Sequence, residues 1–367
     1  MPVPKHIAGT FLIHADAAFL NGAGLGEGEN RNVTVPKLLR DQKNYVPYVS
    51  AQAWKRWLRN TLIDETGWEA SELRGIGQSD KGSTSKISGE LDPVRFPEDD
   101  LFGYMRAQEG QGKKSKAAED DPDAEDTDGA DDVAAKKVKV KALVRSSPFS
   151  ASLLVSLRKT GWQGRDEGFV HLKEGTPLPY STEFYTTHLQ GVFCLAHCRV
   201  GTFENSGDRI EFDEAKAGAY IEARKLVKQG SAYELADVES LRKARSGALL
   251  KALSVLRGGA KQAAFGTDVA PKFLVMAGLS CGNPIFNHLF EEPPTGTLTF
   301  RVSTFLEILN DYADRIVTPV FLGIRSDYLG NQDEVKALAG IHSLQRGPVE
   351  IIVSTPRAAA EGMAGCL

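Results

Sequence analysis

Residues 49–64 (VSAQAWKRWLRNTLID) constrain the fold more than any other stretch, because their polar and apolar side chains separate onto two sides at the 3.6-residue period of a helix. Such a helix must pack one side against a core. The apolar side comprises Ala51, Trp54, Leu58 and Leu62, with Trp57 and Thr61 at its border. The polar side comprises Gln52, Lys55, Arg56 and Arg59. Ser50 stands where an N-cap hydroxyl accepts from the amides of the first turn.

The polar side of this predicted helix favours an anionic ligand. In most proteins a basic helix face is only solvated surface. Here no acidic residue occurs on it before Asp64 and Glu65, whereas exposed helices usually mix both signs. The first turn also offers free amide groups and the positive end of the helix dipole, which together bind phosphate. We therefore predict that this side of the helix binds RNA.

A second candidate contact is the glycine-rich segment 258–267 (GGAKQAAFGT). Lys261 and Gln262 follow a flexible Gly-Gly pair, and Phe265 comes shortly afterwards. This combination can join a phosphate contact to base stacking. The alternative is an ordinary helix end followed by a turn, since glycine commonly ends helices.

The net charge of the chain is −4, but outside one acidic segment the chain is mildly basic. Nine acidic residues lie within residues 119–132, and without them the net charge would be +5. Residues 107–137 are poor in apolar side chains, so we predict a disordered acidic insertion there. Residues 67–100 are polar and rich in glycine, which predicts a loop-rich insertion. The whole chain, 1–367, is expected to form a single domain with these insertions.

The sequence offers little sign of a cofactor, a metal or a membrane. Four cysteines are too few for a disulfide framework in 367 residues, and Cys194 and Cys198 are expected to be buried thiols rather than metal ligands. We see no signal peptide and no apolar run long enough to span a membrane, so a cytoplasmic location is expected. The glycines of residues 21–32 lack the P-loop spacing, and Pro36 follows them where a dinucleotide site needs a helix. We therefore expect no cofactor.

The order of the predicted elements indicates the fold class. Alternating stretches predict strands, and longer polar stretches with an apolar stripe predict helices. Strands are expected at residues 6–20, 138–157, 181–203, 271–279, 318–323 and 349–354. Helices are expected at residues 49–64, 215–229, 232–256 and 302–314, before an Ala/Gly tail. This order predicts an α+β fold of the split βαβ type, an antiparallel sheet with helices packed on one face.

The sequence resembles the backbone subunit of CRISPR Cascade complexes, a RAMP-superfamily protein, and most closely its DevR-like branch in type I systems. The resemblance is carried by short motifs that occur in the family's order. Residues 49–59 match its Ser-x-Gln-x-x-Lys-Arg-x-x-Arg helix, and residues 259–262 match its Gly-x-Lys-Gln loop. Further agreement comes from residues 19–21 (FLN), 100–105 (DLFGYM) and 181–185 (STEFY). The 107–137 insertion departs from the pattern.

The resemblance implies an RRM-like (ferredoxin-like) core with finger and thumb insertions, and a role in antiviral defence without catalysis. Its expected partners are a CRISPR guide RNA, target DNA that pairs with the guide, further copies of the chain and other Cascade subunits. The residues that the family's motifs would place on the guide RNA are Asn21, Arg31, Ser50, Gln52, Lys55, Arg56, Arg59, Lys261 and Gln262. Phe265 belongs to the same loop.

Two other functions remain open. One is an RNA-cleaving subunit like those of type III effectors, in which an acid near the loop after the first strand cuts RNA; Asp16, Glu27 and Glu29 are the candidates. They lack a histidine or lysine at an obvious catalytic spacing. The other is a small-molecule enzyme that uses the glycines of residues 22–28, but we see no nucleophile or acid–base pair to accompany them.

Overall fold

The computed structural model describes residues 2–26, 32–72, 74–78, 84–106, 143–170, 172–207, 209–293 and 297–367. At its centre is β1 (His6–Ala18), most of whose side chains are buried. β1 pairs antiparallel with β13 (Leu178–Leu195) on one side and with β18 (Phe273–Leu279) on the other. The predicted acidic insertion at 107–137 lies outside the described residues.

The core has the strand order of an RRM-like fold. β18, β1, β13 and β11 (Leu154–Ser156) are neighbours in that order, and each neighbouring pair is antiparallel. Helix α1 (Ala51–Thr66) follows β1 in the chain, and helix α4 (Val238–Ser254) follows β13. These six elements form the β-α-β-β-α-β arrangement, which confirms the predicted α+β fold of the split βαβ type.

The sheet continues beyond this core at both sides. Next to β18 lie β21 (Val320–Ile324), β23 (Gly347–Ser354) and β22 (Gly340–Leu344). Beyond β11 lie β5 (Asn44–Val49) and β4 (Leu38–Asp41). Shorter strands that join this sheet are β2 (Gly22–Leu25), β3 (Val33–Pro36) and β10 (Phe149–Ala151). Most pairings are antiparallel; β21 with β23, and β13 with β3, are parallel.

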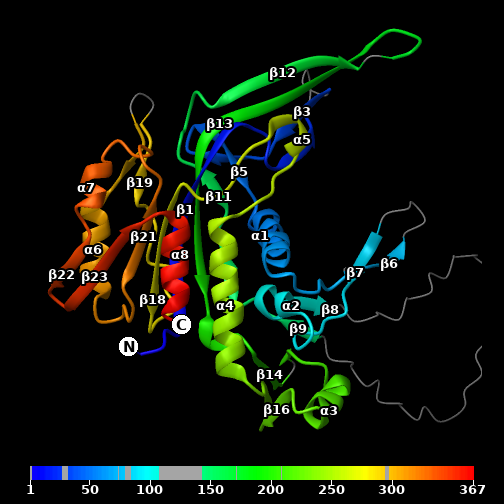
Figure 1. Ribbon diagram of the computed structural model, residues 1–367. Helices are drawn as coiled ribbons and strands as arrows, with labels where there is room; N and C mark the ends of the chain where they lie inside the picture. The colour runs from blue at the N-terminus through cyan, green and yellow to red at the C-terminus, as the bar shows by residue number, and fades with distance from the viewer. Residues whose placement is uncertain are drawn as a thin grey trace, which may run out of the picture.

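Helices cover both faces of the sheet, whereas the sequence predicted helices on one face. Alternate residues of β1 point to opposite faces. Phe11 and Ile13 belong to the core cluster that contains residues of α1, α4 and α8 (Pro356–Gly365). Ala8 and Leu12 belong to a second cluster with residues of α6 (Val302–Tyr312) and α7 (Gln332–Lys336). Figure 1 shows α4 and α8 side by side over one face, with α6 and α7 in the C-terminal part of the molecule.

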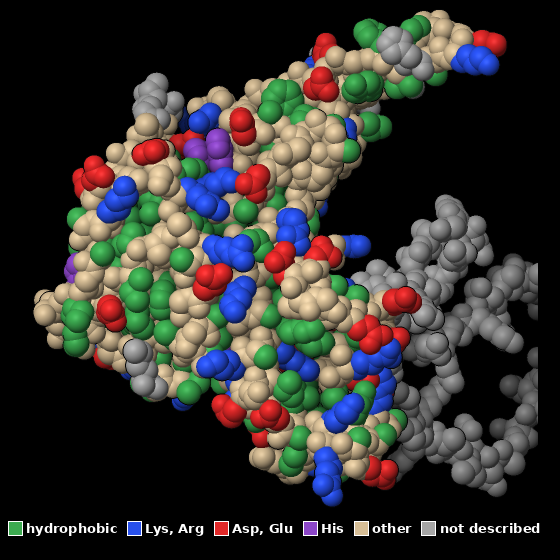
Figure 2. Space-filling model, viewed as in Figure 1, with side chains coloured by type: hydrophobic (Ala, Val, Ile, Leu, Met, Phe, Trp, Pro, Cys, Tyr) green, Lys and Arg blue, Asp and Glu red, His purple; other side chains and the backbone are tan. Residues whose placement is uncertain are grey.

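A small second sheet lies at the end of the molecule opposite the long arm (Figure 1). Its strands, in spatial order, are β16 (Leu226–Gln229), β17 (Ala232–Leu235), β14 (Thr202–Ser206), β15 (Arg209–Ile210), β9 (Leu143–Arg145) and β8 (Tyr104–Arg106). Helices α2 (Pro97–Phe102) and α3 (Glu214–Glu222) and the 3₁₀ turn η2 (His197–Arg199) accompany it. The arm is formed by β12 (Gln163–Val170) and the first residues of β13. It carries exposed apolar side chains, among them Phe169 and Tyr180 (Figure 2).

Buried ion pairs join the small sheet to the core. The Arg145 side chain is fully buried; it pairs with Asp100 of α2 and lies 3.2 Å from the Glu211 carboxylate. The other oxygen of Asp100 accepts a hydrogen bond of 2.7 Å from Arg245 of α4. Because the buried carboxylates of Asp100 and Glu211 both have cationic partners, the network joins α2, α4 and the small sheet.

Three stretches differ from the sequence expectation. Residues 226–235, predicted within two helices, form the β16–β17 hairpin, because Leu226, Tyr233 and Leu235 pack into the core of the small sheet. The C-terminal tail contains helix α8. Residues 67–100 hold the β6 (Arg74–Gln78) and β7 (Thr84–Ser88) hairpin and α2 besides loops. The remaining elements are one short strand pair, β19 (Phe290–Glu291) with β20 (Thr299–Phe300), and the four-residue helix α5 (Gln262–Phe265) after α4.

Candidate nucleic-acid interface

Helix α1 begins beside the segment that follows β1. Ser50 is the N-cap, and its hydroxyl accepts a hydrogen bond from the Ala53 amide at 3.4 Å. The Ser50 amide in turn donates to Asn21 Oδ1 at 3.1 Å. The first turn of α1 contains no acidic residue. The helix dipole is therefore not neutralised there, and two of the predicted residues lie together at its positive end.

Three predicted side chains of α1 lie outside the core, and two of them are cations without acidic partners. Gln52 and Arg56 are exposed, and within the described part of the chain the Arg56 guanidinium forms no hydrogen bond or ion pair. Lys55 is half-buried, and its Nζ donates to Ser147 Oγ at 3.0 Å. Burial lowers the pKa of Lys55 below that of an exposed lysine. An anion at this position would therefore stabilise the charged form of Lys55.

Arg59 lies in a different setting on the same helix. Its Nη2 donates to the Ser71 carbonyl at 2.9 Å and to Glu98 Oε1 at 3.1 Å. The Glu98 side chain is fully buried at the start of α2. Because Glu98 already neutralises its guanidinium, Arg59 joins α1 to α2 rather than offering a free charge.

The glycine-rich segment after α4 contacts α1 directly. The Arg257 amide donates to Thr61 Oγ1 at 3.1 Å, and the Ala260 amide donates to the Leu20 carbonyl at 3.0 Å. A Cβ on Gly258 would lie 2.3 Å from the Trp57 ring, and its φ of +152° is one that other residues rarely adopt. Glycine is therefore required for the segment to approach the helix, and it brings the two predicted contacts together.

The side chains after the glycines all have partners within the protein. Lys261 has φ +50°; its Nζ donates to Thr182 Oγ1 at 2.7 Å and lies 5.1 Å from the centre of the Phe19 ring. Gln262 donates to the Gly258 carbonyl and so closes the turn. The ring of Phe265, expected to stack on a base, packs against Phe184 at the base of the arm, with a centroid separation of 5.9 Å. In this loop, Lys261 is the side chain best placed to meet a phosphate.

We call the group Asn21, Ser50, Gln52, Lys55, Arg56 and Lys261 the α1 surface. Among the residues described, no carboxylate forms an ion pair with any of its three cations. Arg31, predicted to join this group, lies outside the described residues. Sequence reasoning missed the hydroxyl partners of its lysines, Ser147 and Thr182, because each lies far along the chain from the lysine that it contacts. Thr182 belongs to the 181–185 motif, but the motif gives no sign of this contact.

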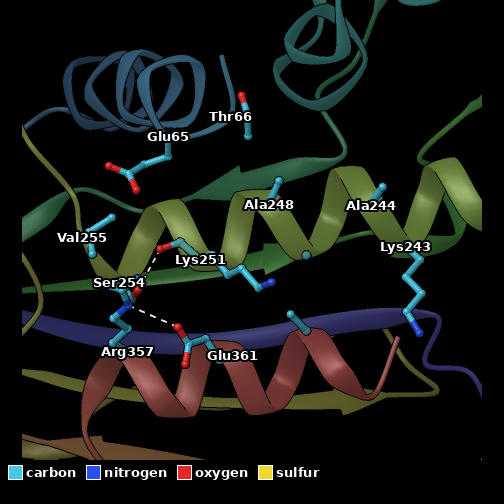
Figure 3. A pocket seen from close by; sticks show the side chains of 12 residues that line it. Glu65, Thr66, Lys243, Ala244, Ala248, Lys251, Ser254, Val255, Arg357 and Glu361 are labelled. Atoms are coloured by element: carbon cyan, nitrogen blue, oxygen red, sulfur yellow. Dashed lines mark hydrogen bonds and ion pairs between the residues drawn. The ribbon is translucent and has the colours of Figure 1, made fainter. Parts of the chain in front are cut away.

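A hollow on the same side of the sheet is less suited to a nucleic acid. It lies beside α4, α8 and the end of α1, and Ala244 and Ala248 of α4 are among the residues that line it (Figure 3). Lys243 and Lys251 project from α4 at its rim, but the Arg357 side chain is paired with Glu361 at 3.2 Å. Cations and acids are intermixed over this region (Figure 2). Among the described residues, neither Lys243 nor Lys251 forms an ion pair, which makes the two lysines suitable control positions.

Of the three acids that the RNA-cleaving alternative would use, the structure describes only Asp16. Asp16 is exposed near the end of β1 and accepts a hydrogen bond of 3.4 Å from Thr186. Glu27 and Glu29 lie outside the described residues.

The part of the chain that the structure describes has no group of three or more His, Cys, Asp or Glu placed to hold a metal ion. Cys194 is buried as expected, whereas Cys198 is exposed. Within the same described part, no helix is both long and apolar enough to cross a membrane.

Comparisons with known proteins find similar folds among solved structures but no related sequence. No protein-family model and no curated protein sequence matches the chain. A chain of a "CRISPR RNA-guided surveillance complex, pre-nicking" aligns over 99% of this chain and 100% of its own, with 12% identity and a TM-score of 0.50. A chain of another "CRISPR RNA-guided surveillance complex" aligns over 98% of both chains, with 11% identity and a TM-score of 0.47.

A third chain, from a Type III-B Cmr-beta complex bound to cognate target RNA, covers 54% of this chain and 49% of its own, with 11% identity and a TM-score of 0.29. At such identities structural similarity establishes no more than a shared fold. The alignment to the chain of the pre-nicking complex therefore shows a similar overall fold.

Proposed function

We propose that this chain binds a CRISPR guide RNA through the α1 surface, as the backbone subunit of a type I Cascade-like complex of the DevR-like branch. Several copies would stack along one guide, which would pair with target DNA. In this proposal the protein is a binding subunit and not an enzyme. Sequence recognition belongs to base pairing, and the protein holds the backbone of the RNA.

The observation that carries the proposal is that Lys55, Arg56 and Lys261 have no acidic partner among the residues that the structure describes. Most buried or half-buried arginines of the described core are paired with carboxylates, as Arg145 and Arg245 are with Asp100. The three cations of the α1 surface instead contact neutral hydroxyls or solvent. A phosphate chain would supply the missing negative charge, since phosphate contacts dominate sequence-independent binding of nucleic acids.

The neutral members of the surface fit the same ligand. Asn21 and Ser50 fix the start of α1, where free amides and the helix dipole attract anions. Gln52 is exposed one turn before Arg56 and can donate to a phosphate or a ribose hydroxyl. These contacts read no base edges, as a subunit that accepts any guide sequence requires.

The test is charge reversal on the α1 surface. The Lys55→Glu/Arg56→Glu variant should purify without RNA when it is expressed with a guide, because it converts two attractive contacts into repulsive ones. The ratio of absorbance at 260 and 280 nm reports the RNA content. Since Lys55 is half-buried and its reversal can disturb folding, Arg56→Glu alone is measured as well and should lose part of the RNA with an unchanged thermal unfolding temperature.

The matched control is Lys243→Glu/Lys251→Glu, which reverses two unpaired lysines beside the α4–α8 hollow. It should keep its RNA. Full RNA occupancy in both α1-surface variants contradicts the proposal. Equal loss of RNA in the control variant also contradicts it, because the effect would then reflect net charge and not this surface.

A further inference from the structure

The β4–β5 hairpin carries an exposed basic and aromatic patch that the α1 surface does not include. Arg40 and Lys43 are exposed, and 58% of the Tyr45 surface is accessible to solvent. The Arg40 Nε donates to the Gln42 carbonyl at 3.1 Å, which leaves the guanidinium without an acidic partner among the described residues. The hairpin's one acid, Asp41, is paired with Lys159. The patch therefore keeps an excess of positive charge.

The hairpin is fixed to the α1 surface by backbone hydrogen bonds. β5 ends at Val49, immediately before the N-cap Ser50. The Lys37 amide donates to the Asn21 carbonyl at 2.8 Å, and the Tyr48 amide donates to the Lys37 carbonyl at 3.1 Å. The hairpin therefore lies next to the start of α1 and is joined to it both along the chain and by hydrogen bonds.

The register places the patch on the side of the sheet where α1 lies. Arg40 is the cross-strand partner of Tyr45, and Leu38 is the partner of Pro47. Because alternate residues share a face, Leu38 and Arg40 point to the same side. Leu38 packs against the core cluster that contains Trp54 of α1. At about 3.3 Å per strand residue, the five residue steps from Tyr45 to Ser50 span roughly 16 Å, a distance that a few nucleotides of a single strand cover.

We propose that the β4–β5 hairpin is a second contact for the RNA strand held by the α1 surface, in which Arg40 and Lys43 bind phosphates and Tyr45 stacks on a base. The inference rests on the proposed function for the identity of the ligand. Its chemistry is that of single-stranded RNA sites, where cations follow the backbone and an aromatic ring receives any base.

The experiment uses RNA-free full-length protein and a fluorescein-labelled single-stranded RNA of mixed sequence, titrated between 50 and 200 mM salt. Each phosphate contact contributes about 0.7 to the slope of log K against log salt for a single strand. Arg40→Ala/Lys43→Ala should therefore lower the slope by about 1.4. Tyr45→Ala should weaken binding by about 5- to 100-fold. Tyr45→Trp should restore binding, because any aromatic ring can stack on a base. A purely structural role of Tyr45 would instead require the tyrosine itself.

The control, Lys243→Ala/Lys251→Ala, removes the same number of positive charges, two, from α4 and should leave the slope unchanged. An unchanged slope in Arg40→Ala/Lys43→Ala, together with weakened binding by Arg56→Glu, overturns the hairpin inference and leaves the proposed function standing. If Arg56→Glu also binds normally, both fail. A change confined to duplex DNA, with RNA binding unaffected, overturns the inference as well, because the hairpin would then contact another strand.

Discussion

The network around Arg145 and the α1 surface use the same cationic side chains in opposite ways. In the network, Arg145 and Arg245 share the Asp100 carboxylate, and all three side chains are almost fully buried. On the α1 surface, Lys55 and Lys261 contact the hydroxyls of Ser147 and Thr182, and no acid faces them among the described residues. Cations that are paired with carboxylates stabilise the fold. Cations that contact only neutral groups are not neutralised within the protein, so they can bind an anionic ligand.

Arg59 lies at the boundary between the two regions. It is on the basic side of α1, yet its partner Glu98 places it with the paired cations. Position on a helix face is therefore a weaker guide to binding than the partner of the charge. The comparison predicts that mutations in the network change stability and mutations on the α1 surface change RNA affinity.

The largest effect is expected when the shared carboxylate of the network is removed. Asp100→Asn leaves two buried arginines without their common counter-charge, so the free energy of unfolding should fall by about 3–5 kcal/mol. Urea denaturation measures the loss. RNA affinity, measured under conditions in which the variant is folded, should stay at the wild-type value. A loss of affinity without a loss of stability would break the distinction between the two regions.

The free energy of unfolding is expected to fall by about 3 kcal/mol at acidic pH because of a buried histidine near the same network. His197 is buried with its Nδ1 2.8 Å from Ser246 Oγ, and burial lowers the pKa of His197 to about 4. As the pH falls below the ordinary value of about 6.5, the unfolded chain binds the proton first, so stability is lost between pH 6.5 and 4 at about 1.4 kcal/mol per unit. Urea titrations at several pH values measure this slope.

His197→Gln isolates that contribution from the carboxylates that titrate in the same range. The variant should be less stable at pH 7, because the packing around the ring is lost, but its stability should fall less steeply between pH 6.5 and 5. An identical pH slope in both proteins would show that the protonation of His197 does not contribute to the pH dependence of stability.

A smaller effect, about 2–3 kcal/mol, is expected at the boundary. Arg59→Gln leaves the Glu98 carboxylate buried without its cation, and burying an unpaired charge is costly. The double variant Arg59→Gln/Glu98→Gln should recover part of the loss, as a thermodynamic cycle of urea midpoints would reveal. RNA affinity should change little in either protein. A loss of RNA comparable to that of Arg56→Glu would place Arg59 on the ligand instead.

The smallest stability effect is expected on the α1 surface. Arg56→Ala removes an exposed side chain without a described partner, so its free energy of unfolding should stay within about 0.5 kcal/mol of wild type. Its affinity for single-stranded RNA should nevertheless decrease, and the salt slope should fall by about 0.7. Fluorescence anisotropy measures both quantities. Destabilisation as large as that of Arg59→Gln would mean that Arg56 has a structural role.

Local patterns predicted the parts of the fold that depend on nearby residues. The α1 helix, its Ser50 cap and its buried Trp54 and Leu58 follow from residue spacing, and the structure confirms all three. The β16–β17 hairpin was read as helix because its polar residues hid the alternation of Leu226, Tyr233 and Leu235. Helix α8 has a cap at Thr355 and begins at Pro356, but its buried face consists largely of alanines. The sequence therefore shows no clear apolar stripe there and does not predict the helix.

The site could be predicted only as a set of residue types. The meeting of Gly258 with Trp57 brings together segments about 200 positions apart, and the family motifs, not spacing, suggested it. The pairing of Arg59 with Glu98 left no local signal, since the partners are 39 residues apart. Sequence therefore identified which cations lie on the helix, and the structure identified which of them have no acidic partner.

The central claim is that RNA lies against the α1 surface, and photocrosslinking tests it most directly. The guide-bound protein is irradiated, digested, and searched by mass spectrometry for peptides that carry a nucleotide. The account predicts crosslinks within residues 50–59 and 258–265. Crosslinks confined to the small sheet or to the α4–α8 hollow, with both of those segments unmodified, would contradict it.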